Sequence, residues 1–322
     1  MFVRRLFIAA ACLCALGVSF AQAQNYPSRS VKIIVPFGAG GPADVFARVL
    51  AEHLSQGLKQ PFVVEDRPGA GSIVGTEAVH QSAPDGYTLL LMSNTHTTNE
   101  SLVPNKPFEL MRDFAPVAPI NYSDLLMVIH PSVEAKNLKE FIALAKAKPG
   151  QLNYASSGPG TPYHMAGELF KAMSGTDIVH VPHRASGDAR NSVIGGHVQM
   201  MFDAITTMRS IAQGGKVRAL ATTGEKRSPL MPDVPTVAEA GVPGYEATIW
   251  LGLMAPKGTP PEIIKLLNAE VNKAIDLPAV KDAWAEQGAI PMHMSPEQFD
   301  AYLRKDIEKW AHVVKVSGAT VR

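Results

Sequence analysis

Two stretches of the chain carry the same pattern at a constant offset of 120 residues. KIIVPFGAGGPADVFARVL begins at Lys32 and LNYASSGPGTPYHMAGELF begins at Leu152. Each reads as an apolar strand, a glycine-rich turn, a proline and an amphipathic helix. The matched turn residues are Gly38 with Gly158, Gly40 with Gly160 and Pro42 with Pro162. A strand–turn–helix unit that occurs twice in register predicts two related halves.

Strand and helix patterns alternate along the rest of the chain. Short apolar runs such as VKIIVP at 31–36 and LLMVIH at 125–130 predict buried strands. Further strands are expected at 62–65, 87–92, 152–155, 178–181, 198–202 and 217–222, and helices at 42–56, 73–83, 138–147, 259–275 and from 295 onward. This alternation predicts an α/β fold with mostly parallel sheets covered by helices. A length of 322 residues suffices for about two domains.

Each repeat also predicts an anion-binding site where its helix begins. The first N–H groups of a helix have no intrahelical partner, and the helix dipole adds about half a positive charge there. Glycines at the turn let a ligand approach the backbone closely. Two such sites, one in each domain, are expected to face one another across a cleft. A small carboxylate held between them needs no buried lysine or arginine.

The first glycine loop fits a second hypothesis as well. Residues Gly38–Ala43 satisfy G-x-G-x-x-G/A after a strand, and Glu65 or Asp66 follows where an acid that binds a ribose hydroxyl is expected. This spacing is typical of an NAD-dependent oxidoreductase, which we keep as the alternative. The export signal described next counts against it, because a freely exchanging nicotinamide cofactor is not expected outside the cytoplasm. The second glycine loop also has no role in that scheme.

The first 23 residues have the features of a secretory signal peptide. Arg4 and Arg5 precede an apolar run, and Ala21-Gln22-Ala23 fits an A-x-A cleavage site. The run is shorter than the roughly 20 residues of a membrane-spanning helix. Cleavage near Ala23 removes both cysteines, two of the 30 basic residues and none of the 29 acidic ones, so the formal charge changes from +1 to −1. We expect a periplasmic protein without disulfide or thiolate site.

Other functional motifs are missing or weak. The sequence has no G-x-S-x-G, H-E-x-x-H or G-x-x-x-x-G-K-[ST] pattern. His180 and His183 lie three apart on a predicted strand, so they point to opposite faces. Together with His164, His197 and Asp203, these two histidines match no standard sequence spacing of metal ligands. We therefore expect no catalytic residue, metal or cofactor, and a charge near zero argues against a nucleic-acid partner.

The loops of the chain carry a family resemblance. The motifs are VPFGAGGPADVFAR (35–48), EDRPGAGSIVGTEAV (65–79), PDGYTLLL (84–91), RDFAPVAPI (112–120), SSGPGTPYHMAGELF (156–170), PDVPTVAEAG (232–241) and APKGTPPEIIKLLN (255–268). Together they cover essentially the whole chain after the signal peptide, in this order. In this combination the sequence resembles the substrate-binding receptors of tripartite tricarboxylate transporters, also called the Bug family.

The resemblance implies both a fold and a function. The fold is an α/β, two-domain periplasmic-binding-protein clamshell (type II-like), with each domain a mixed sheet flanked by helices. Domain I is expected to span residues 24–123 plus about 245–322 and domain II residues 124–244, with the proline-rich stretch 228–244 crossing back between them. The implied protein is a monomeric periplasmic receptor without enzymatic activity. It captures a small carboxylate and delivers it to the membrane permease subunits of the transporter.

The residues expected to hold the ligand lie on the two glycine loops or beside them. The first loop and its helix provide Phe37, Gly38, Ala39, Gly40, Gly41 and Asp44, and the second loop and its helix provide Ser157, Gly158, Gly160, Thr161 and His164. The remaining expected residues are Thr95, in a variable loop (93–99) beside the distal part of the ligand, His183 and Asp203.

The chain departs from the family pattern near the wall of the second domain. His183 and Ala185 stand where the family usually has Tyr and Gly, and Asp188 replaces a residue that is commonly Pro or small. Tyr163 is bulkier than the residue of many members. Arg184 is expected to pair either with a distal carboxylate of the ligand or with Asp188. The sequence therefore leaves the ligand open among citrate-like, dicarboxylic, amino-acid and aromatic-acid compounds.

Overall fold

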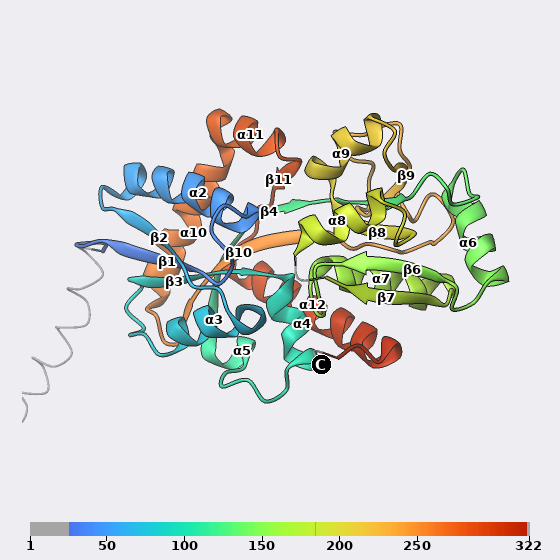
Figure 1. The fold of residues 1–322 in the computed structure, drawn as a ribbon. Coiled ribbons are helices and arrows are strands. Elements are labelled where there is room, and N and C mark those ends of the chain that lie inside the picture. The colour runs from blue at the N-terminus through green and yellow to red at the C-terminus, as the bar shows by residue number, and fades with distance from the viewer. Residues whose placement is uncertain (1–25, 184, 321–322) are drawn as a thin grey trace, which may run out of the picture.

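A computed structural model of the chain describes residues 26–183 and 185–320. It has two lobes, each built on a β-sheet with helices on both faces (Figure 1). The expected signal peptide and Arg184 lie outside the described residues. Within the described ranges, no helix combines the length and the apolar character needed to cross a membrane.

The sheet of the first lobe combines strands from both ends of the chain. Its strand order is β11-β4-β10-β3-β1-β2. Strand β1, next to the edge strand β2, runs parallel to β2 and β3, whereas β10 runs antiparallel to β3 and β4. The strands are β1 (Val31–Val35), β2 (Phe62–Asp66), β3 (Thr88–Ser93), β4 (Phe114–Ser123), β10 (Ile249–Pro256) and β11 (Ala289–Pro291).

The sheet of the second lobe has the order β7-β6-β8-β5-β9. Strand β6 runs parallel to β7 and β8, and β5 runs antiparallel to β8 and β9. The strands are β5 (Leu125–Ile129), β6 (Leu152–Ser156), β7 (Ile178–Pro182), β8 (Met200–Ala204) and β9 (Arg218–Thr222). Both sheets are mixed, so the prediction of mostly parallel sheets from the strand–helix alternation is wrong, because β10 and β5 enter each sheet antiparallel to their neighbours. The clamshell of two helix-flanked mixed sheets, which the resemblance implies, is confirmed.

Helices cover both faces of each sheet. They are α2 (Pro42–Leu58), α3 (Ile73–His80), α4 (Asn94–Leu102), α5 (Leu110–Asp113), α6 (Leu138–Ala147), α7 (Pro162–Ser174), α8 (Ser186–Ile194), α9 (Ile205–Gln213), α10 (Pro261–Asp276), α11 (Pro278–Ala285) and α12 (Pro296–Ser317), with a 3-10 turn η1 (Ala70–Ser72). In the first lobe α2, α10 and α11 cover one face, and α3, α5 and the start of α12 cover the other (Figure 1).

Strand β1 shows why the apolar run at its position is continuous rather than alternating. Ile33 packs with α2 and α10 on one face, while Ile34 packs with α3 and α12 on the other. Both side chains are buried, at 0% and 2% exposure. Strands covered on both faces need apolar residues at every position. Full burial of one such side chain is worth roughly 1.5–3 kcal/mol.

Two expectations about local structure were wrong. The segment 93–99, expected as a loop, begins α4, because Ser93 and His96 form a capping box at its N-terminus. The proline-rich stretch 228–244 does not cross between the lobes. Val237 and Val242 pack into the core of the second lobe, and the chain returns to the first sheet only as it enters β10.

The last helix, α12, belongs to both lobes. Phe299 and Leu303 in its first half pack into the core of the first lobe. Trp310 and Val313 in its second half pack into the core of the second lobe, beside α7. The expected domain I included the whole C-terminal segment. Within α12, only the first half packs with the first lobe.

Asp306 lies at the middle of α12, where the two halves meet. One carboxylate oxygen accepts hydrogen bonds from Thr97 Oγ1 of α4 at 2.6 Å and from Trp250 Nε1 of β10 at 3.3 Å. The other accepts from Trp310 Nε1 at 3.2 Å. Burial raises the pKa of Asp306 to about 6, and the hydrogen bonds from Thr97 and Trp250 oppose the shift.

We predict a pH-dependent contribution of Asp306 to stability. Because its pKa is higher in the folded than in the unfolded chain, folding takes up a proton between roughly pH 4 and 6, and stability rises as the pH falls through this window. The free energy of unfolding of the wild type should increase by about 1 kcal/mol relative to Asp306→Asn between pH 7 and pH 5. Urea unfolding of both proteins at pH 7 and at pH 5 measures this free-energy difference. The same difference between wild type and variant at both pH values would contradict the prediction.

Candidate functional site

The two glycine loops share a hydrogen-bonding pattern as well as a sequence pattern. Gly40 and Gly160 have nearly the same left-handed φ, +74° and +75°, which only glycine adopts without strain. The N–H of Gly40 donates to Asp44 Oδ2 at 2.8 Å, and that of Gly160 donates to His164 Nδ1 at 3.0 Å. In both loops the acceptor is the third residue of the helix that follows. The repeat found in the sequence is therefore also a repeat in three dimensions.

This pattern changes which backbone groups are open to a ligand. The N–H groups of Gly40 and Gly160 are already used inside their loops. The N–H groups of Gly41 and Thr161 are also used, because they donate to the carbonyl oxygens of Gly38 and Gly158 at 3.3 and 3.4 Å. The next donors along the chain belong to Ala43 and Tyr163, the second residues of α2 and α7, whose N–H groups have no intrahelical acceptor. Each follows a proline, which has no N–H to offer.

A polar network of neighbouring side chains holds the second glycine loop in place. Ser156 Oγ accepts the N–H of Gly158 at 3.1 Å and lies 2.6 Å from His180 Nε2. The ring of His180 stacks on that of His164, with centroids 4.1 Å apart. Burial lowers the pKa of His164 to about 4 and that of His180 to about 3. His164 is therefore neutral at pH 7, as its Nδ1 must be to accept the N–H of Gly160.

Helix α4 brings a third N-terminus to the same region. Ser93 Oγ accepts the N–H of Thr95 at 3.2 Å, and His96 Nδ1 accepts the N–H of Ser93 at 3.1 Å. Burial lowers the pKa of His96 to about 4, so the ring is neutral and its Nδ1 can act as the acceptor. The ring also packs edge-on against Phe37 of the first glycine loop. Helix α4 and the first loop thus support each other.

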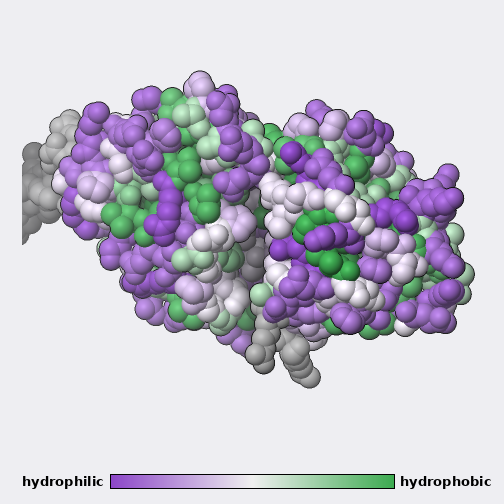
Figure 2. Space-filling view, turned by 45° about the horizontal axis from the view of Figure 1, so that its top comes forward, coloured by the Kyte–Doolittle hydropathy of each residue, from purple (hydrophilic) through white to green (hydrophobic). Residues whose placement is uncertain are grey.

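A cavity of about 220 Å³ lies between the lobes, where these elements meet. Figure 2 shows the two lobes separated by a groove. Four helices of the described chain begin at the cavity, since its lining includes the first residues or N-caps of α2, α4, α7 and α9. The residues concerned are Pro42, Ala43, Ser93, Thr95, Pro162, Tyr163, Ala204 and Thr206. Each helix N-terminus contributes partial positive charge to this space.

The strands that cross between the lobes form another wall of the cavity. Along β4, Asn121 and Ser123 face this cavity, whereas Tyr122 faces a second cavity on the opposite side of the crossing strands. Side chains alternate in this way because successive residues of a strand point to opposite faces. On β10, Ile249 and Leu251 line the first cavity.

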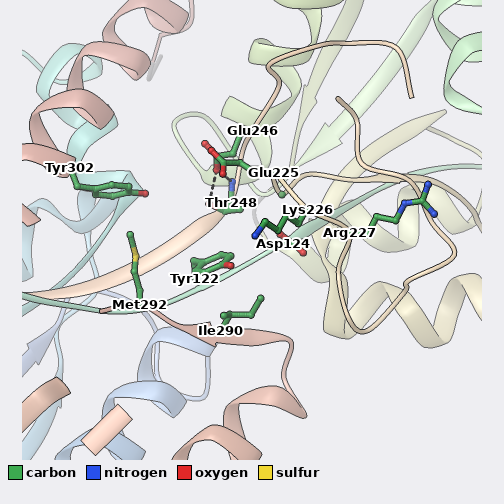
Figure 3. A pocket seen from close by; sticks show the side chains of 11 residues that line it. Tyr122, Asp124, Glu225, Lys226, Arg227, Glu246, Thr248, Ile290, Met292 and Tyr302 are labelled. Carbon is green, nitrogen blue, oxygen red and sulfur yellow. Dashed lines mark hydrogen bonds between the residues drawn. The ribbon is translucent and has the colours of Figure 1, made fainter. Parts of the chain in front are cut away.

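The second cavity, of about 440 Å³, has a different character (Figure 3). Asp124, Glu225, Lys226 and Glu246 line it, and Arg227 points away from it toward its ion pair with Glu239. Its lining residues include no N-cap or first-turn residue of a described helix. We therefore assign the candidate site to the 220 Å³ cavity, called the cleft below.

The expected site residues divide into three groups. Those that line the cleft are Phe37, Gly38, Gly41 and Thr95. Those that shape the two loops beside it are Ala39, Gly40, Asp44, Ser157, Gly158, Gly160, Thr161 and His164. The last two are not among the residues that line the cleft: His183 lies beside the Gly158 turn, and Asp203 lies in the interior of the second lobe. His183 Nδ1 lies 3.1 Å from the carbonyl oxygen of Val181, and fully buried Asp203 pairs with Arg190 at 2.8 Å.

Sequence reasoning missed the part of the cleft that comes from the crossing strands. Asn121, Ser123, Ile249 and Leu251 line the cleft, but none lies near a glycine loop in the sequence. Alternation along β4 was the available signal. It was hidden because this ten-residue strand is buried over most of its length and carries two prolines.

Comparison with known proteins identifies the family. The sequence model of the family described as "Tripartite tricarboxylate transporter family receptor" matches residues 46–319 of this chain. The chain belongs to this receptor family. Protein BugT of Bordetella pertussis is 40% identical over 303 residues, which cover 94% of this chain and 93% of the relative. A protein from Pseudomonas sp. strain P51 is 35% identical over 304 residues, covering 93% and 90% of the two chains.

Solved structures of the family have the same fold. The structure of Rpa4515 from R. palustris with adipate superposes with a TM-score of 0.81 at 32% identity, covering 92% of this receptor and 99% of that chain. MatC from Rhodopseudomonas palustris with bound malate has a TM-score of 0.77 at 32% identity, with coverages of 90% and 100%. These relatives bind small carboxylates, as their descriptions state.

We predict that Gly40→Ala weakens ligand binding in addition to destabilising the fold. Its φ of +74° strains alanine by about 1–2 kcal/mol, and relief of this strain displaces the loop. The tightest ligand from a carboxylate screen should bind roughly tenfold more weakly, a loss of about 1.4 kcal/mol by titration calorimetry.

Gly318→Ala is the matched control for Gly40→Ala. Gly318 follows α12 with a φ of +67°, and like Gly40 it has open space where a Cβ would lie. It should lose similar stability and keep full affinity. Equal affinity of both variants would show that the first loop does not hold the ligand.

Proposed function

We propose that this receptor captures a small carboxylate in the periplasm and delivers it to the membrane permease subunits of a tripartite tricarboxylate transporter. One observation carries the proposal: four helix N-termini meet at a cleft between two lobes. Such N-termini bind anions through unpaired N–H groups and dipoles. The adipate and malate described for family members support a carboxylate as the ligand.

The proposed site has one glycine loop on each lobe. Phe37, Gly38, Gly41 and Thr95 contact the ligand from the first lobe, together with the N–H of Ala43. Ser157, Gly158, Gly160 and Thr161 form the opposing loop. Asp44 and His164 position the loops through the hydrogen bonds described above. His183 supports the second loop from beside Gly158, and Asp203 supports the second lobe from its interior through its pair with Arg190. Catalytic residues, metal ions and cofactors have no part in this proposal.

Capture is proposed to work by closure of two domains on the ligand. The proposed domains are residues 24–123 with about 245–322, and residues 124–244, with the second half of α12 packed on the second domain. The lobes touch on both sides of the cleft. A Cβ at Gly160 would lie 2.6 Å from Leu102 of α4, and one at Gly288 would lie 2.6 Å from Leu230. A ligand that contacts both lobes favours the closed arrangement and shifts the equilibrium toward it.

The alternative, an NAD-dependent oxidoreductase, fits the geometry less well. Asp66, at the end of β2, is paired with Arg48 at 2.9 Å, and Glu65 is paired with Arg67 at 2.6 Å. The cleft of about 220 Å³ is smaller than the roughly 300–1,000 Å³ of pockets that hold drug-sized ligands, and a dinucleotide is at least that large. The antiparallel β10 at the centre of the sheet also departs from the dinucleotide-binding order.

We predict that the exported protein begins at Gln24. The first 23 residues are proposed to direct secretion and to be removed after Ala23. Mass spectrometry of the protein recovered from the periplasmic fraction should show a mature chain without either cysteine. Recovery of full-length protein from the membrane fraction would contradict both cleavage and a free periplasmic receptor.

We also predict that a bound carboxylate raises the apparent stability. A ligand at 100 times its Kd stabilises the folded state by about 2.7 kcal/mol, which a thermal-shift screen of mono-, di- and tricarboxylates detects. The radius of gyration from small-angle X-ray scattering should decrease on binding if closure accompanies it. Stabilisation by NAD but by no carboxylate would overturn the receptor proposal. Size-exclusion chromatography with light scattering tests the proposed monomer.

A further inference from the structure

We propose that the cleft selects a monocarboxylate whose remaining part is uncharged and largely apolar, and that Asn121 donates a hydrogen bond to it. This inference rests on the proposed function and narrows its ligand class. Di- and tricarboxylates and amino acids are then the disfavoured ligands. The inference follows from the side chains that line the cleft, from the charges that surround it and from one unpaired donor.

No described residue that lines the cleft has a charged side chain at pH 7, because burial raises the pKa of Tyr163, the one ionisable residue among them, further above its ordinary value. The walls away from the glycine loops are mostly apolar, with Phe46, Ile249 and Leu251 on the first lobe and Tyr163 on the second. A single carboxylate is accommodated by the helix N-termini. A second one would lie against these walls without a cation, and burying an unpaired charge is costly.

The described cations nearest the glycine loops are already paired with acids. Arg48 of α2 contacts Asp44 at 2.6 Å and Asp66 at 2.9 Å. Arg190 of α8 contacts the buried Asp203 at 2.8 Å. Drawing either guanidinium toward a distal carboxylate would leave a buried acid unpaired, which costs more than the new contact returns.

The same pairing disfavours an amino-acid ligand. An ammonium group needs an anionic or carbonyl acceptor in the cleft, and it is repelled by the helix N-termini that attract the carboxylate. The two acids nearest the loops are engaged, because Asp44 binds Arg48 and the N–H of Gly40, and Asp203 binds Arg190 and the N–H of Ala204. Neither side chain lines the cleft.

Asn121 provides the independent observation that points to a ligand. It lies on β4 with 2% exposure and lines the cleft. Its Nδ2 is buried and has no hydrogen-bond partner in the described part of the chain. Buried polar groups in folded proteins are almost always paired, and leaving one unpaired costs about 1–3 kcal/mol. A carboxylate or carbonyl oxygen of the ligand would satisfy this donor.

The test compares ligands that differ by one carboxylate. Hexanoate is compared with adipate and benzoate with terephthalate by titration calorimetry on the wild-type receptor, with malate, citrate and glutamate as further probes. Hexanamide and benzamide are the controls without a charge. We expect at least one monocarboxylate to bind at least tenfold more tightly than its dicarboxylate partner, and its amide to bind more weakly than the acid.

The outcomes separate this inference from the proposed function. If adipate, malate or citrate binds and the monocarboxylates bind equally or more weakly, the ligand class inferred here is wrong and the carboxylate receptor stands. If glutamate binds most tightly, the exclusion of amino acids is wrong. If none of these carboxylates binds, the proposed function fails as well.

Two variants of the cleft test the inferred contacts. Asn121→Leu removes the donor at similar volume and should weaken the preferred monocarboxylate at least fivefold. Tyr122→Phe is its matched control, because Tyr122 lies on the same strand but faces the second cavity (Figure 3). Unchanged affinity of Asn121→Leu would remove Asn121 from the site.

Ile249→Lys supplies a cation that the described residues lining the cleft lack. It should raise the affinity for adipate relative to hexanoate at least tenfold if the absence of a cation sets the preference. An unchanged ratio, with native circular dichroism and a cooperative melting transition, would contradict that explanation.

Discussion

The structure depends on the N–H groups that remain unpaired where a helix begins. Helices α2, α4, α7 and α9 all begin at the cleft, so donors and partial positive charge surround it, and none of the described residues that line it has a cationic side chain. Much of the nearby structure serves to direct these ends. Glycines with left-handed φ turn the loops, and the third residues of α2 and α7 hold them in place.

Neutral histidines are part of the same arrangement. His96 and His164 accept backbone N–H groups at the starts of α4 and α7, and burial keeps both rings uncharged at pH 7. Asp44 takes the equivalent position in the first loop and has its charge balanced by Arg48. A carboxylate in the first loop and an imidazole in the second thus accept the equivalent backbone N–H group. In each case the charge near the ligand stays small, so the backbone remains the main source of positive potential.

Much of the fold was predictable because its signals are local. The strand–turn–helix units at Lys32 and Leu152 and the apolar runs of the buried strands specify an α/β protein with two related halves. The resemblance of the loops then identified the family, and Phe37, Gly38, Gly41 and Thr95 were expected near the ligand and line the cleft. Helix α4 was missed because its residues are polar on every side, and its burial depends on distant elements such as α12.

The sequence by itself determined the position and the backbone conformation of the two glycine loops, because glycine, proline and the start of a helix constrain the backbone within a few residues. Only the tertiary structure decided what else surrounds the ligand. Asn121 and Leu251 reach the cleft because β4 and β10 pair side by side, although they are 130 residues apart in the chain. Asp203 lies in the interior of the second lobe, where Arg190 pairs with it. Such partners come from long-range packing, which no local pattern encodes.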